Sequence, residues 1–134
     1  MRNKKCILVV DDERLIVMTT CILLRHLGYE TREAFDGESA LAAARKDPPD
    51  IILLDLMMPG LDGWQVLARL KGYPETADIP VVIFSAKEYA NAEITNNLRG
   101  AAGQISKPFE PEDLEEILQR VELQRDAGHD ATEL

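Results

Sequence analysis

The sequence has only two cysteines, Cys6 and Cys21, and both lie in apolar runs. Two isolated thiols cannot form the dense disulfide framework of a small secreted protein, so they fit a reducing compartment. Long apolar stretches are also missing, because the apolar run behind the basic residues 1–5 is short and ends at Asp11. The N-terminus therefore predicts neither a signal peptide nor a membrane span, and we expect a cytoplasmic protein.

Basic residues are scarce as well, with 15 Lys and Arg against 24 Asp and Glu, which gives a formal net charge of −9. This balance argues against direct binding to nucleic acid or to an anionic membrane. The sequence also lacks G-x-G-x-x-G and Walker phosphate loops, internal repeats and low-complexity tracts. A chain of 134 residues with 46% hydrophobic content is expected to form one compact domain with its own core.

Apolar runs alternate with helical patterns along the chain. Strands are predicted over residues 6–10, 29–35, 51–55, 81–84 and 103–106, and the second of these alternates like a strand at a sheet edge. Helices are predicted to begin near residues 14, 37, 63, 89 and 111, the fourth being the weakest pattern. The first helix is apolar over much of its circumference, so we expect it to be well buried and to end at Gly28.

Five strands alternating with five helices predict a doubly wound α/β domain with a five-stranded parallel sheet. We assign this domain to residues 1–123 and expect residues 124–134 to form a frayed polar tail. In such folds, ligands bind outside the carboxyl ends of the strands. We therefore expect the functional residues of this chain at those ends.

Polar side chains stand at the carboxyl ends of four predicted strands. Asp11 and Asp12 follow the first strand, Asp55 ends the third, Ser85 follows the fourth and Lys107 follows the fifth. Each alone has an ordinary explanation, such as a helix cap, a turn residue or a solvated charge. Their shared edge of the sheet favours a common site over separate explanations.

The chemistry of this set points to phosphoryl transfer. Three close carboxylates repel one another, and a hard divalent cation such as Mg²⁺ relieves that repulsion through oxygen ligands. Lys107 adds an ammonium and Ser85 a hydroxyl, both suited to phosphoryl oxygens. Asp55, at the end of a buried strand, could then act as a nucleophile and become an acyl phosphate.

These residues also carry a family resemblance. The motifs are Asp11-Asp12, Asp55-Leu-Met-Met-Pro59-Gly-Leu-Asp62-Gly63, Ser85-Ala86 and Lys107-Pro108-Phe109. Together, in this order and spacing, they resemble the receiver domain of two-component response regulators, over roughly residues 4–123. The resemblance implies a flavodoxin-like sheet with strand order 2-1-3-4-5.

The resemblance further implies the roles of the acidic residues. Asp55 would accept a phosphoryl group from a histidine kinase or a histidine phosphotransfer protein. Asp12 would bind Mg²⁺ directly and Asp11 through water, together with Asp55 and the backbone carbonyl of Met57. Met57 and Lys87 would flank the site where receivers set the rate of acyl-phosphate hydrolysis.

The remaining implied roles concern the switch. Lys107 would pair with the phosphoryl oxygens, and its bond to Pro108 would be cis. Ser85 would move to bind the phosphoryl group and shift the face made by the fourth helix, the fifth strand and the fifth helix, where a downstream protein binds. Gln104 occupies the position where receivers usually have Tyr or Phe, so a hydrogen-bonding switch or another output surface is expected to replace the aromatic one.

Three other interpretations explain the sequence less well. A flavodoxin-type protein would not place Asp11-Asp12-Glu13 where a flavin phosphate binds, and a haloacid-dehalogenase-type phosphatase would need a second aspartate at Met57. A phosphorylation-independent docking module with the receiver fold is the third, and Gln104 is its only support. The chain after the last helix is too short for an output domain, so a stand-alone receiver is expected, with no catalytic role for Trp64, His26 or His129.

Overall fold

A computed structural model describes residues 4–86 and 100–133 of the chain. It has a five-stranded parallel sheet in the order β2-β1-β3-β4-β5, as predicted. The strands are β1 (Cys6–Val10), β2 (Glu30–Ala34), β3 (Ile51–Asp55), β4 (Val81–Ala86) and β5 (Gly103–Lys107). The described helices are α1 (Arg14–His26), α2 (Gly37–Lys46), α3 (Gly63–Gly72) and α5 (Pro111–Glu133). The helix predicted to begin near residue 89 lies outside the described residues.

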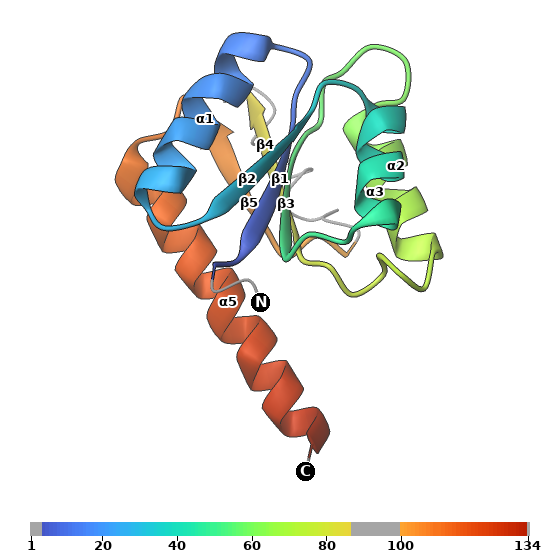
Figure 1. Ribbon diagram of the computed structural model, residues 1–134, viewed down its shortest axis with the longest axis vertical. Helices are drawn as coiled ribbons and strands as arrows, with labels where there is room; N and C mark the ends of the chain where they lie inside the picture. The colour runs from blue at the N-terminus through green and yellow to red at the C-terminus, as the bar shows by residue number, and fades with distance from the viewer. Residues whose placement is uncertain (1–3, 87–99, 134) are drawn as a thin grey trace.

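Helices cover both faces of the sheet, with α1 and α5 on one side and α2 and α3 on the other (Figure 1). The continuous apolar runs of β1 and β3 are buried on both faces because each face packs against helices. Along each strand, alternate residues enter different cores. Val9 and Leu53 face α1 and α5, whereas Val10 and Leu54 face α2 and α3.

The predicted edge strand and helix ends are confirmed in most places. β2 lies at the edge of the sheet, and α1 ends at His26 just before Gly28, whose φ of 101° suits glycine. The helix α2 starts after Asp36, which accepts a hydrogen bond from the Ser39 backbone N–H at 2.8 Å. The end of α1 and the start of α2 are thus set by residues close to them in the sequence.

Burial of α1 was predicted wrongly. Its buried residues are Val17, Thr20, Cys21 and Leu24, on the side that faces the sheet. Leu15, Met18 and Ile22 are 75%, 55% and 62% exposed, on the opposite side. A helix in this position packs against the sheet along one stripe, so the second apolar stripe stays on the surface.

The last helix also differs from its prediction. We expected a frayed tail from Gln124, but α5 continues to Glu133 and projects beyond the body of the domain (Figure 1). Leu114, Ile117, Leu118 and Val121 pack into the core as predicted. The later segment contains no proline and many good helix formers, so the helix propagates past its last core contact.

Candidate functional site

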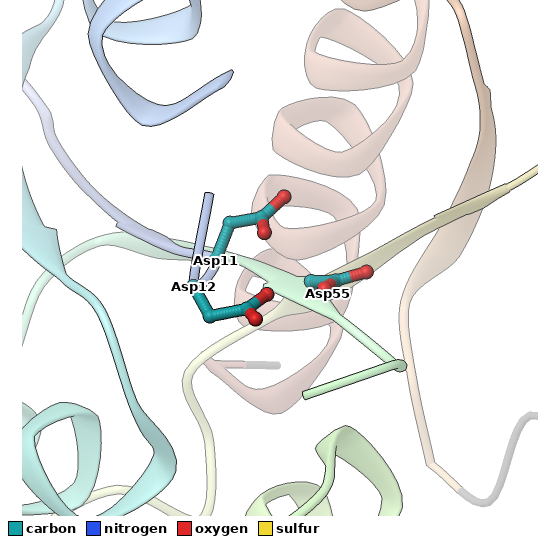
Figure 2. Close-up of side chains that lie close together, drawn as sticks. All are labelled: Asp11, Asp12 and Asp55. Carbon is teal, nitrogen blue, oxygen red and sulfur yellow. The ribbon is translucent and has the colours of Figure 1, made fainter. Parts of the chain in front are cut away.

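The register of the central strands brings the acidic residues together. Val10 pairs with Leu54, so the following residues, Asp11 and Asp55, are neighbours at the carboxyl ends of β1 and β3. Asp12 comes next in the chain. One carboxylate oxygen of each of the three aspartates lies within 4.8 Å of the others (Figure 2). The structure therefore brings the three predicted carboxylates into one cluster.

Burial within this cluster is uneven. Asp11 is fully buried and Asp55 is 3% exposed, whereas Asp12 is exposed to solvent. Asp11 also accepts a hydrogen bond at 3.0 Å from the backbone N–H of Glu13, so it shapes the turn into α1. The helix-cap reading of Asp11 is not confirmed, because the N-cap of α1 is Glu13; the bond from Asp11 instead supports the turn before the helix, and this role coexists with membership of the cluster.

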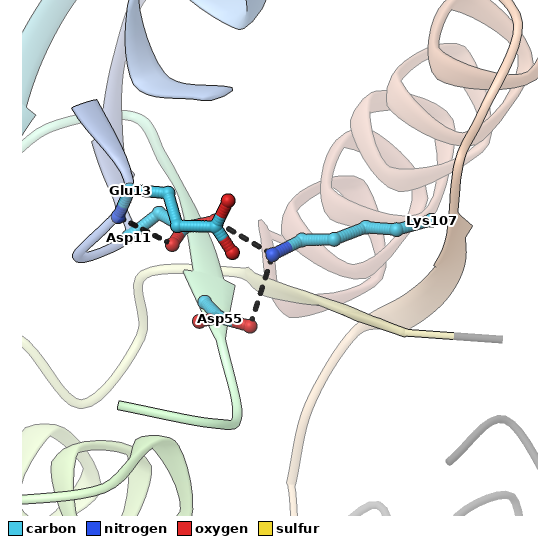
Figure 3. Close-up of polar contacts among 4 residues, drawn as sticks. All are labelled: Asp11, Glu13, Asp55 and Lys107. Atoms are coloured by element: carbon cyan, nitrogen blue, oxygen red, sulfur yellow. Dashed lines mark hydrogen bonds and ion pairs between the residues drawn. The ribbon is translucent and has the colours of Figure 1, made fainter. Parts of the chain in front are cut away.

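Lys107 supplies the positive charge of the site. Its ammonium donates to Asp11 at 2.6 Å and to Asp55 at 3.2 Å, bridging the two buried carboxylates (Figure 3). The Lys107 side chain is only 16% exposed. The Lys107–Pro108 bond is cis, as the resemblance implied.

The protonation of Asp55 reflects these surroundings. Burial and, to a smaller extent, the negative charge of Asp11 together raise the pKa of Asp55 to about 6, against the opposing effect of Lys107. Burial alone would lower the pKa of Lys107, but its hydrogen bond to Asp11 and the charges of both carboxylates outweigh burial and raise it. At neutral pH the site thus holds an ionised Asp55 beside a firmly protonated lysine.

The donor set fits a hard divalent cation. All three clustered side chains offer carboxylate oxygens, the ligands that Mg²⁺ prefers, and no thiolate or imidazole is among them. The raised pKa of Asp55 records the cost of placing its charge in a buried site beside Asp11, and a bound cation would relieve that cost. Asp11, Asp12 and Asp55 are therefore the side chains that could hold the metal.

The loop after Asp55 is held by contacts that the sequence analysis missed. The backbone N–H of Gly63 donates to the Leu56 carbonyl at 3.0 Å, and a Cβ at Gly63 would collide with the Asp55 carbonyl. Asp62 and Gln65 form a reciprocal capping box at the start of α3. The spacing of Asp62 and Gln65 could have revealed this cap. These contacts press the first turn of α3 against the end of β3.

The other predicted residues lie near the cluster or beyond what is described. Ser85 belongs to β4, paired in register with Ser106, but its side chain lies outside the described part of the structure, as does Lys87. Gln104 is half-buried on β5, opposite Ile83. Met57 has an exposed side chain, and its backbone N–H hydrogen bonds to Asp55.

A surface groove of about 830 Å³ begins beside the cluster. It runs between α1 and the segment that joins β5 to α5, and its lining includes Leu15, Ile22, His26, Lys107 and Phe109. Leu15 and Ile22, two residues of the exposed apolar stripe of α1, lie on one wall. His26 also lines this groove.

Comparison with known proteins identifies relatives of the whole fold. The family model of the response regulator receiver domain matches residues 7–119. The probable transcriptional regulator ycf27 of Porphyridium aerugineum is 37% identical over 124 residues, which is 90% of this chain and 50% of that protein. The response regulator PleD of Caulobacter vibrioides is 44% identical over 104 residues, 78% of this chain and 23% of PleD.

Solved structures of other proteins have the same fold as this chain. The chemotaxis protein CheY4 of Vibrio cholerae aligns with a TM-score of 0.82 and 32% identity, covering 88% of this chain and 98% of CheY4. NtrX from Brucella abortus aligns with a TM-score of 0.87 and 33% identity, covering 96% of this chain and 29% of NtrX. The chain spans half or less of the length of the curated relatives described above. Among the described residues, no helix is long and apolar enough to cross a bilayer.

Proposed function

The chain belongs to the response regulator receiver family, and from this membership and the geometry of the site we propose that it is a phosphoacceptor whose Asp55 takes a phosphoryl group from a phosphorylated histidine. The carrying observation is the contact of Lys107 with both Asp55 and Asp11, in the carboxylate cluster that Asp12 completes. A nucleophile, a cation and a set of metal ligands meet at one point.

The transfer step follows from these groups. An Asp55 oxygen attacks phosphorus, the phosphorus–nitrogen bond to the donor histidine breaks, and its electron pair stays on the imidazole. The product is an acyl phosphate on Asp55, which water later hydrolyses back to the carboxylate and phosphate. We take the chain to promote only these two steps on itself. It would thus be a signalling protein and not an enzyme acting on other substrates.

The neighbouring side chains each have one task in this step. The Lys107 ammonium already contacts Asp55 and would pair with the phosphoryl oxygens that arrive there. Mg²⁺, when held by Asp11, Asp12, Asp55 and the Met57 carbonyl, would supply positive charge to neutralise the phosphoryl oxygens. Burial of Asp11 and Asp55 strengthens these electrostatic effects by excluding water.

The output is a change in protein contacts. We propose that Ser85 binds the phosphoryl group and that the response reaches β5 and α5, together with the segment of residues 87–99. Gln104 lies on β5, half-buried, where its amide can exchange hydrogen bonds without the rotation of an aromatic ring. A downstream protein, rather than nucleic acid or membrane, would bind this face in the cytoplasm, consistent with the net charge of −9.

The donor is expected to approach over the groove beside α1. The groove ends at Lys107, and the exposed side chains of Leu15 and Ile22 on its wall offer apolar area to a protein that brings a histidine to Asp55. An Ile22→Ser variant should slow phosphotransfer in a profile against purified histidine kinases of the source organism while leaving phosphorylation by acetyl phosphate unchanged. Equal rates from the kinases for the variant and the wild type would contradict this approach.

The second candidate is a docking module with the receiver fold that is never phosphorylated, and its support is Gln104 at the usual aromatic position. Intact-mass measurement after incubation with acetyl phosphate separates the two. A single phosphoryl adduct that needs Mg²⁺ and is absent from Asp55→Asn supports the phosphoacceptor. Absence of an adduct despite demonstrated Mg²⁺ binding, with acetyl phosphate and with the kinase panel, would favour the docking module.

A further inference from the structure

Four side chains gather on one face of the sheet at its carboxyl edge. Asp11, Asp55 and Lys107 continue the alternation of Val9, Leu53 and Ile105, the residues that face α1 and α5. On the intervening strand β4, the residue on this face is Phe84, which pairs in register with Asp55 on one side and with Ile105 on the other, so Lys107 lies two residues beyond Phe84's partner on β5.

The order of the strands places Phe84 in the path of the Lys107 side chain. Lys107 lies on β5 and its partner Asp55 on β3, so the lysine side chain must cross β4 to reach the carboxylate. Its ammonium lies 4.6 Å from the centroid of the Phe84 ring, over the ring face. Phe84 is fully buried in the core that α1 and α5 cover, so the ring is fixed.

A second aromatic ring supports the first. Phe109, two residues after Lys107, packs edge-on against Phe84 with ring centroids 6.4 Å apart and an interplanar angle of 72°. The cis bond at Pro108 lies between the lysine and this ring. The Lys107 segment therefore holds the ring that its own ammonium contacts.

We infer that Phe84 is a positioning residue that keeps the Lys107 ammonium at the nucleophile, an inference that rests on the phosphoacceptor function proposed above. The ammonium has two carboxylate partners, Asp11 and Asp55, and both are groups that a metal ion or a phosphoryl group would engage. The π face of Phe84 remains available to the ammonium when a metal ion or a phosphoryl group engages the carboxylates. It attracts the cation and closes one side of it to water.

The contact itself can be read spectroscopically. In the metal-free protein, the Lys107 ε-methylene and ammonium resonances should be shifted upfield by the ring current of Phe84. Phe84→Leu should move them toward ordinary lysine values, whereas Val82→Ala, in the same core and on the same strand, should leave them in place. Ordinary lysine shifts in the wild type would overturn the contact. This measurement does not depend on phosphorylation.

The functional consequence is tested by a double-mutant cycle on the rate of phosphorylation by acetyl phosphate with Mg²⁺. Phe84→Leu should slow the reaction roughly 3- to 30-fold when Lys107 is present, the range that a partly desolvated cation–π contact corresponds to. In the Lys107→Met background the same change should have almost no effect. An equal slowing in both backgrounds would mean that Phe84 acts only through the fold and would overturn the inference.

Two further measurements distinguish a failure of the positioning role from a failure of the phosphoacceptor function. Phe109→Leu, at a half-buried ring, should slow the Lys107 protein in the same direction but less, and it serves if Phe84→Leu does not fold. Normal rates for both ring variants would refute the positioning role. Absence of any Asp55 adduct in the wild type would refute the phosphoacceptor function instead, while the lysine resonances would still report whether the ring holds the ammonium.

Discussion

Asp55→Asn should make the metal-free protein more stable at neutral pH, although it removes one partner of Lys107. Asp55 is 3% exposed, and burial together with Asp11 raises its pKa from 3.8 to about 6. That shift of about two units corresponds to roughly 3 kcal/mol by which the folded state disfavours the ionised carboxylate. Lys107 keeps its shorter bond to Asp11 at 2.6 Å, so most of this gain is retained.

The pH dependence gives the sign of the effect. Below about pH 4, Asp55 is protonated in both the folded and the unfolded chain, so the substitution should change little. Between pH 4 and 6 the unfolded chain releases the proton while the folded state retains it, and the wild type loses stability as pH rises. Above about pH 7 the full difference is present. We expect a gain of about 1–3 kcal/mol there, or roughly 4 to 12 °C in melting temperature.

The assay is thermal or urea unfolding in EDTA at several pH values. Glu33→Gln is the control, at an exposed residue of β2 that is not part of the cluster. It also removes one negative charge, so it measures how far a smaller net charge than −9 by itself changes stability. Saturating Mg²⁺ should narrow the gap by stabilising the wild type. A variant no more stable than the wild type at pH 7.5, or a gain that is the same at pH 4, would refute the repulsion argument.

Mg²⁺ at one hundred times its dissociation constant should stabilise the wild type by about 2.7 kcal/mol, and an unchanged melting temperature at millimolar Mg²⁺ would count against the cluster. Gly63→Ala should cost about 1–3 kcal/mol in urea unfolding because its Cβ would lie 2.6 Å from the Leu56 Cα, while Gly72→Ala, with nothing within 4 Å, should cost almost nothing. Burial and the nearby Glu122 raise the pKa of Tyr29 from 10.0 to about 12. The neutral phenol therefore stabilises the folded state fully below pH 10, and this stabilisation is lost as the pH rises from 10 to 12. Tyr29→Phe should lose less stability than the wild type over that pH range.

The buried carboxylates at the carboxyl edge of the sheet could be predicted from the sequence because the relevant signals are local. A buried parallel strand appears as a continuous apolar run, and the residue that ends the run lies at the edge of the sheet where ligands bind. Asp11 and Asp55 follow this rule, whereas Lys107 ends the short, less apolar strand β5 and is identified by its place at the same edge. The edge strand β2 and the stop at Gly28 are equally local, since alternation and a left-handed glycine act within a few residues.

Contacts between strands far apart in the chain were decided only by the tertiary structure. Apolar periodicity does not say which stripe of α1 the sheet covers, so the exposure of Leu15 and Ile22 was not predictable. Phe84 contacts the Lys107 ammonium because β4 lies between the strands that carry Lys107 and Asp55, and the sequence alone does not give that strand order. The sequence determined which groups reach the edge of the sheet, whereas the order of the strands determined which of them touch, because those contacts join residues tens of positions apart.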